Sequence, residues 1–173
     1  MSRPFVVSTG ELFRHPGARQ QVVLVGPLSG VALSTSRLTD DDIHADLTLE
    51  AQGSTLTVTG RVVARWTGEC RRCLATTGGE LAIDLREIFE PHPVEGETYR
   101  LHADHVDLEP ALREALALAL PLAPLCDEAC AGPDPEDHPV TVEDGDDRPS
   151  ANGTDGAPPD PRWSALDALR FDR

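Results

Sequence analysis

The chain of 173 residues contains no lysine, few aromatic residues and no long apolar run. All 15 basic residues are arginines, which we attribute to genome composition, because lysine and arginine normally share a solvated surface. Aromatic residues make up 4% of the chain, so its core must be mainly aliphatic. No apolar stretch approaches the length of a membrane span, and residues 1–7 lack the pattern of a signal peptide. The sequence therefore predicts a cytoplasmic protein that has no membrane partner.

Acidic residues outnumber basic residues by 15. Residues 1–125 hold 17 acids and 11 arginines, a net charge of −6, whereas residues 126–173 hold 13 acids and 4 arginines, a net charge of −9. A surface this acidic repels nucleic acid at long range, which argues against DNA binding and against broad contact with RNA. One small basic group remains a candidate contact for RNA or a partner, with solvated arginines on strand faces as the alternative: Arg61, Arg65, Arg71 and Arg72.

The only four cysteines form two close pairs, Cys70 with Cys73 and Cys126 with Cys130. In the cytoplasm thiols stay reduced, so such pairs indicate metal ligands or redox groups before disulfides. Two pairs on turns can converge on one tetrahedral zinc ion, which makes zinc the candidate cofactor. The alternatives are small thiols without a ligand, and a redox pair at Cys70 and Cys73. No βαβ pattern with a helix start surrounds that pair.

Alternation of apolar and polar residues predicts strands in the middle of the chain. Three consecutive runs alternate with a period of two, at residues 43–50, 55–66 and 80–89. Residues 21–25 are a further, shorter candidate. Gly60 interrupts the second run and is expected to form a bulge or a bend. These runs predict an antiparallel meander.

A stripe of leucines predicts one helix after these strands. Asp107 is a suitable N-cap, Pro110 fits the first turn, and Pro121 ends the pattern. The predicted fold class is therefore α+β, an antiparallel β-sheet meander covered by one main helix. The apolar face of this helix is a core contact formed by four residues at helical spacing, Leu108, Leu112, Leu116 and Leu120.

Composition divides the chain into three predicted segments. Residues 1–131 form the α+β domain. Residues 132–159 are rich in proline, glycine and acids with almost nothing apolar, which predicts a flexible, disordered acidic linker. Residues 160–173 begin with an Asp-Pro helix start and predict a short C-terminal anchor helix, which docks on its own domain or on a partner.

Five short motifs follow one another in a defined order. They are Trp-x-Gly-x-Cys-x-Arg-Cys-Leu (66–74), Glu-x-Phe-x-Pro (87–91), Val-Asp-Leu-Glu-Pro (106–110), Ala-Leu-Pro-Leu-Ala-Pro-Leu-Cys (119–126) and Asp-Pro-Arg-Trp (160–163). Each motif is weak alone, but in this order and spacing they resemble the bacterial YceD family over most of the chain. The resemblance implies a role in the accumulation of 23S ribosomal RNA, and hence in assembly of the large ribosomal subunit.

The chain departs from the pattern of many YceD relatives after its second cysteine pair. Those relatives continue with another cysteine pair, whereas this chain has Ala-Gly-Pro-Asp-Pro at residues 131–135. If the missing pair belongs to the metal site of the relatives, this protein either lacks the metal or uses four ligands in another combination. Four cysteines are still enough for a closed tetrahedral site.

The sequence contains no phosphate-binding loop, nucleophile elbow, paired-histidine motif or dinucleotide fingerprint. The first hypothesis is therefore a non-catalytic factor that promotes 23S rRNA accumulation and large-subunit assembly. Its expected partner is the assembling large ribosomal subunit, reached through ribosomal or assembly proteins or through a local rRNA contact. The alternative is an enzyme that uses the cysteine cluster, either a metalloenzyme or a thiol redox protein.

Overall fold

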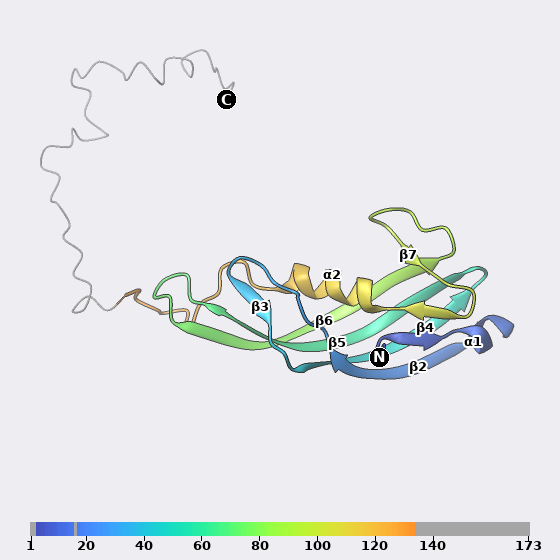
Figure 1. The fold of residues 1–173 in the computed structure, drawn as a ribbon, viewed down its shortest axis with the longest axis horizontal. Coiled ribbons are helices and arrows are strands. Elements are labelled where there is room, and N and C mark those ends of the chain that lie inside the picture. The colour runs from blue at the N-terminus through green and yellow to red at the C-terminus, as the bar shows by residue number, and fades with distance from the viewer. Residues whose placement is uncertain (1–2, 16, 134–173) are drawn as a thin grey trace, which may run out of the picture. The chain divides into compact units, whose positions relative to one another are not determined.

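A computed structural model of the chain describes residues 3–15 and 17–133 (Figure 1). Their main feature is a six-stranded sheet with the order β2-β4-β5-β6-β7, in which β3 pairs with the end of β5 that β4 does not reach. A smaller sheet pairs β1 (Val6–Ser8) with β8 (His105–Asp107). The strands of the main sheet are β2 (Arg19–Pro27), β3 (Ser36–Leu38), β4 (Asp42–Gln52), β5 (Thr55–Glu69), β6 (Thr76–Glu90) and β7 (Tyr99–Arg100).

The described part of the chain is mostly sheet with two helices, α1 (Gly10–Arg14) and α2 (Glu109–Ala119), in agreement with the α+β class. Strands β4, β5 and β6 are consecutive and antiparallel, as the alternating runs predict. The sheet is not wholly antiparallel, because β7 pairs with β6 in parallel. Sequence patterns also miss the five shortest elements, which span two to five residues and are too short to show a period: α1, β1, β3, β7 and β8.

Gly60 does not form the predicted bulge. The register between β4 and β5 continues without interruption through this position, where Leu47 lies opposite Gly60. The glycine is needed for another reason: its φ is +153°, and an added Cβ would collide with the backbone oxygen of Asp46 and lie 2.8 Å from the Cα of Leu47. The close approach of the β4 backbone therefore excludes a side chain at this position.

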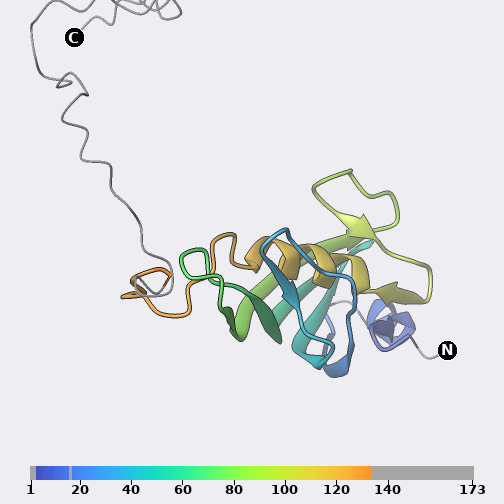
Figure 2. The same cartoon turned by 60° about the vertical axis from the view of Figure 1, so that its left-hand side comes forward.

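Helix α2 lies along the sheet, and its buried leucines belong to the same core as the inward-facing residues of β4 and β5 (Figure 2). The helix begins one residue later than the sequence predicts, with Leu108 at the N-cap position. Asp107 still satisfies a backbone donor, because its carboxylate accepts a hydrogen bond of 3.0 Å from the N–H of Glu109. All four leucines of the predicted stripe are buried. Neither helix of residues 3–133 is long and apolar enough to cross a membrane.

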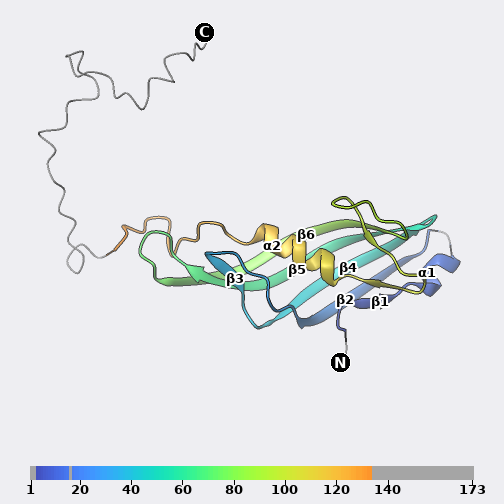
Figure 3. The ribbon, with the colours of Figure 1, turned by 45° about the horizontal axis from the view of Figure 1, so that its top comes forward.

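The strands determine where the functional residues lie. Strand β2 forms one edge of the main sheet. The two long strands β5 and β6 form a hairpin, and the turn at its end carries the first cysteine pair (Figure 3). The predicted anchor helix at 160–173, and the predicted linker at 132–159 apart from its first two residues, lie outside the described residues and stay predictions.

Replacing Gly60 with alanine should lower the free energy of unfolding by about 3 kcal/mol, because the new Cβ forces β4 and β5 apart in a conformation that disfavours a side chain. Urea unfolding measures the change. The matched control is Gly53→Ala, which has a φ of +60° but no atom within 4 Å of the added Cβ, so only the backbone strain of about 1 kcal/mol applies. Equal losses in the two variants would contradict the close-approach explanation.

Candidate metal centre

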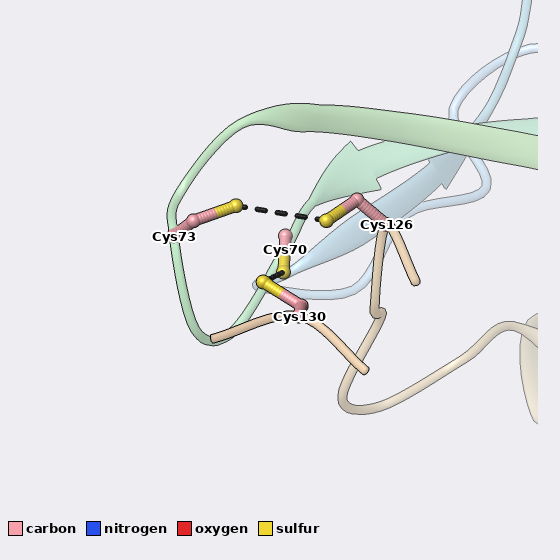
Figure 4. A group of neighbouring side chains, drawn as sticks. All are labelled: Cys70, Cys73, Cys126 and Cys130. Atoms are coloured by element: carbon pink, nitrogen blue, oxygen red, sulfur yellow. Dashed lines mark hydrogen bonds between the residues drawn. The ribbon is translucent and has the colours of Figure 1, made fainter. Parts of the chain in front are cut away.

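All four cysteines meet beyond the end of β5 (Figure 4). The Sγ atoms of Cys70 and Cys130 are 3.8 Å apart, and those of Cys73 and Cys126 are 3.7 Å apart. The four sulfur atoms all lie within 4.8 Å of one another, and all four residues are free thiols. Two pairs that are far apart in the sequence therefore form one cluster, with each close contact joining one pair to the other.

The spacing of the sulfur atoms fits a metal ion. Four thiolates at about 2.3 Å from a tetrahedral zinc ion would lie about 3.8 Å from one another, close to the two shortest distances in the cluster. The cluster could therefore hold a metal ion such as zinc. A set of four sulfur ligands leaves no coordination position open for a substrate, which is the arrangement of structural rather than catalytic zinc sites.

The first cysteine pair lies on the turn between β5 and β6. The N–H of Leu74 donates to the carbonyl oxygen of Cys70 at 2.9 Å, and the N–H of Cys70 donates to that of Ala75 at 2.8 Å. Leu74 closes the turn with a φ of +62°, a conformation uncommon for a residue other than glycine. The sulfur of Cys73 then points across the turn toward Cys126 (Figure 4). This turn joins two antiparallel strands and offers no helix start of the kind a redox pair uses.

The second cysteine pair lies on the segment that follows α2. Asp127 shapes this loop, because its carboxylate accepts a hydrogen bond from the N–H of Ala129 at 2.7 Å and its carbonyl oxygen accepts one from the N–H of Cys130 at 3.1 Å. The loop is joined to the first turn by the N–H of Arg71, which donates to the carbonyl oxygen of Pro124 at 2.9 Å. Backbone contacts thus position both pairs independently of any ion.

Arg72 holds the two cysteine loops together through its side chain. Its Nη1 atom donates to the carbonyl oxygens of Glu128 at 3.0 Å and of Cys130 at 2.6 Å. Hydrogen bonds from a charged donor are stronger than those between neutral groups. The sequence marks Arg72 as a candidate contact for RNA or a partner, whereas this geometry gives it a positioning role within the cysteine cluster.

Two hydroxyl groups that the sequence does not mark as functional position the segment between α2 and Cys126. The buried Ser36 donates to the carbonyl oxygen of Pro121 at 2.8 Å, and Thr35 donates to that of Leu122 at 2.9 Å. Both lie at the start of β3, far from the cysteines in the sequence. No local motif could have identified them, because their role depends on how β3 packs beside this segment.

The thiols of Cys70 and Cys126 have pKa values shifted in opposite directions, and this difference favours the binding of a cation. Backbone N–H groups of Cys73, Cys126 and Arg72 lower the pKa of the Cys70 thiol to about 6, since they stabilise its thiolate. The pKa of Cys126 rises to about 12 because the neighbouring thiols, with Cys130 first, favour its protonated form. One thiolate therefore forms readily at neutral pH, while further negative charge is resisted unless a cation compensates for it.

The four arginines of the predicted basic group lie on two neighbouring elements, strand β5 and the turn that follows it. Arg61 on β5 lies opposite Asp46 on β4 and Asp84 on β6, and Arg65 lies opposite Glu80 on β6. The other two arginines belong to the first cysteine turn. Acidic neighbours on adjacent strands therefore offset the charge of the two strand arginines.

Comparisons with known proteins match most of the chain. A family model described as Large ribosomal RNA subunit accumulation protein YceD matches residues 58–170, which include all four cysteines. An uncharacterized protein of Mycobacterium bovis is 29% identical over 181 residues, covering 96% of this chain and 81% of the relative, and one of Mycobacterium tuberculosis gives the same figures. An uncharacterized protein of Mycobacterium leprae is 32% identical over 98 residues, which cover 52% of this chain and 45% of the relative. No solved structure matches the chain.

Replacing Arg72 with alanine should loosen the second cysteine loop, because two carbonyl oxygens lose a charged donor. We expect the amides of Ala129 and Cys130 to exchange with solvent roughly tenfold to a hundredfold faster, as the loss of a hydrogen bond to a charged group costs about 1.5–3 kcal/mol. Hydrogen exchange measured by nuclear magnetic resonance checks this expectation.

The matched control is Arg71→Ala, which removes the same charge from the same turn. The side chain of Arg71, unlike that of Arg72, makes no hydrogen bond to another described residue. Exchange at Ala129 and Cys130 should stay at the wild-type rate in this control. If Arg72→Ala also leaves these rates unchanged, the positioning role of Arg72 is wrong.

Proposed function

The chain belongs to the YceD family of large ribosomal RNA subunit accumulation proteins, and from this membership we propose that it is a non-catalytic, cytoplasmic factor that promotes 23S rRNA accumulation and large-subunit assembly. The observation that supports a non-catalytic role is the convergence of four cysteines into a set without an open coordination position. A structural centre of this kind shapes a surface for a partner and does not activate a substrate.

The proposed cofactor is one zinc ion held by Cys70, Cys73, Cys126 and Cys130. It would join the turn between β5 and β6 to the segment after α2, and so fix two surface loops that contribute little to the apolar core. The chemistry that zinc supplies here is ligation alone. The lowered pKa of the Cys70 thiol reduces the competition from protons at this ligand at neutral pH.

The proposed partner is the assembling large ribosomal subunit, reached mainly through ribosomal or assembly proteins. The net charge of −15 opposes broad contact with RNA phosphates. Proteins that bind RNA need positive charge to contact its phosphates, so ribosomal proteins that bind RNA have basic surfaces. The acidic surface of this protein would attract such basic surfaces. A local rRNA contact at the first cysteine turn is compatible with this arrangement, because Arg71 is exposed there and carries a free charge among the described residues.

Protein purified without a chelator should contain about one zinc ion per chain, measured by mass spectrometry of the metal. Cys73→Ser should lose most of this zinc, because three remaining thiolates bind the ion more weakly. The matched control is Leu74→Ser, which places the same new side chain at the adjacent exposed position and should keep the metal. Wild-type protein without stoichiometric metal, or a Cys73→Ser variant that retains it fully, would rule out the four-cysteine site.

Deleting the gene should reduce the amount of 23S rRNA and of mature large subunits, measured by sucrose-gradient profiles and RNA quantification. The wild-type gene and Leu74→Ser should restore both, whereas Cys70→Ser combined with Cys73→Ser should restore them poorly, because the proposed partner surface loses its metal.

Normal rRNA levels in the deletion strain would remove the proposed function itself. Full restoration by the double cysteine variant would leave the process intact but exclude a requirement for the metal centre. Immunoblots of variant protein in the same cells separate loss of function from loss of protein.

A further inference from the structure

Strand β2 is an open edge of the main sheet (Figures 1 and 3). All nine of its residues pair with β4 on one side. On the other side, no backbone hydrogen bond joins β2 to another described segment. The outward N–H and C=O groups of this strand therefore form a row that another strand can extend.

Between its two ends, β2 has no residue of the kind that protects an edge strand against pairing, since Pro27 is its last residue. Its only charged residue is Arg19 at its first position, and Val23 and Val25 are 71% and 45% exposed on the face of the sheet opposite the core. On the opposite side of the sheet, β6 differs because it carries several charges and is paired over two residues with the last strand, β7. Charges on an edge strand are a common protection against association, and β2 has almost none.

The segment that contains β2 is also unusual in having no acidic residues. Residues 12–39 contain no aspartate or glutamate and three arginines, although the whole chain has 30 acids. This acid-free segment contains all of β2 and β3. Two copies of a chain with a net charge of −15 repel each other through most of their surfaces. A contact of β2 with β2 brings no acidic residues of the two edge strands together, and the acids of β4 that lie opposite β2, Asp42, Asp46 and Glu50, are one strand away from the contact.

We propose that β2 pairs with β2 of a second copy of this chain, antiparallel about a two-fold axis, so that the two main sheets become one. An antiparallel edge is complementary to itself and needs no second surface, and the symmetry closes the assembly as a dimer. Val23 lies at the centre of β2, so the two copies bring their exposed valines together on one face. This inference is independent of the proposed function and of the metal centre.

The dimer should be reversible. Each backbone hydrogen bond replaces one to water and so contributes little net free energy, and one strand per copy makes a narrow contact. Salt should strengthen the association, because it screens the repulsion between the acidic surfaces that flank the contact. This dependence on salt is the opposite of that expected for a contact held by ion pairs.

Analytical ultracentrifugation of the full chain over a range of concentrations tests the proposal. The wild-type mass should rise with concentration from 18.6 kDa toward twice that value, and more readily at higher salt. Val23→Lys should weaken the dimer at least roughly tenfold, because it places two like charges beside the two-fold axis. The matched control is Ile88→Lys, which adds the same charge at a 44% exposed position of β6, at the far side of the same sheet.

Hydrogen exchange provides a readout that does not depend on the variants. Amides of β2 that point away from β4 should become protected as the wild-type concentration rises, while the edge of β6 stays unchanged. The proposal would be overturned if the wild-type protein remained monomeric at every concentration of protein and salt. This includes the case in which β2 pairs with a strand of a different protein and not with a second copy. Equal weakening by Val23→Lys and Ile88→Lys would also overturn it.

Discussion

The pairing of β5 with its neighbours is the constraint on which the rest of the structure depends. This strand pairs with β4 over nine residues and with β6 over fourteen, and its far end pairs with β3. Gly60 lets the β4 backbone approach closely enough to keep the register unbroken. That register sets which side chains face the core, and it places Cys70 directly after β5. Its neighbours Glu69 and Arg71 donate backbone hydrogen bonds there to Thr35 and to Pro124 of the segment after α2. The cysteine cluster is therefore a consequence of strand length and register.

The cysteine cluster and the apolar core stabilise different parts of the molecule. The core joins the inward faces of the strands to the leucines of α2. Apart from Leu120, the segments that carry the cysteines do not belong to this core, and they are positioned by hydrogen bonds from Ser36, Thr35 and Arg72. A metal ion that joins such loops stabilises the folded chain most effectively, because the residues it brings together are far apart in the sequence. Such an ion would define a local surface and leave the sheet unchanged.

Charge separates the surfaces on which this protein can meet other molecules. Acidic residues dominate the chain and offset the arginines of β5 across adjacent strands, which leaves no broad basic face among the described residues. Residues 12–39 differ from the rest of the chain because they contain no acids, and they include β2, an edge strand of the main sheet. A basic partner therefore fits the acidic surfaces, whereas a second copy fits the β2 edge. The two kinds of contact use different parts of the molecule and can coexist.

Elements whose pattern is local can be predicted from the amino-acid sequence alone. Alternation predicts β4, β5 and β6, leucine spacing predicts α2, and five motifs in order indicate the family, because each depends on residues close together in the chain. The convergence of the two cysteine pairs, the contact of Arg72 with both loops and the close approach at Gly60 are visible only in the folded chain. So is the position of β2, which has no strand on its outer side among residues 3–15 and 17–133. These features depend on contacts between segments that are distant in the sequence, and such contacts follow from the register and packing of the whole sheet.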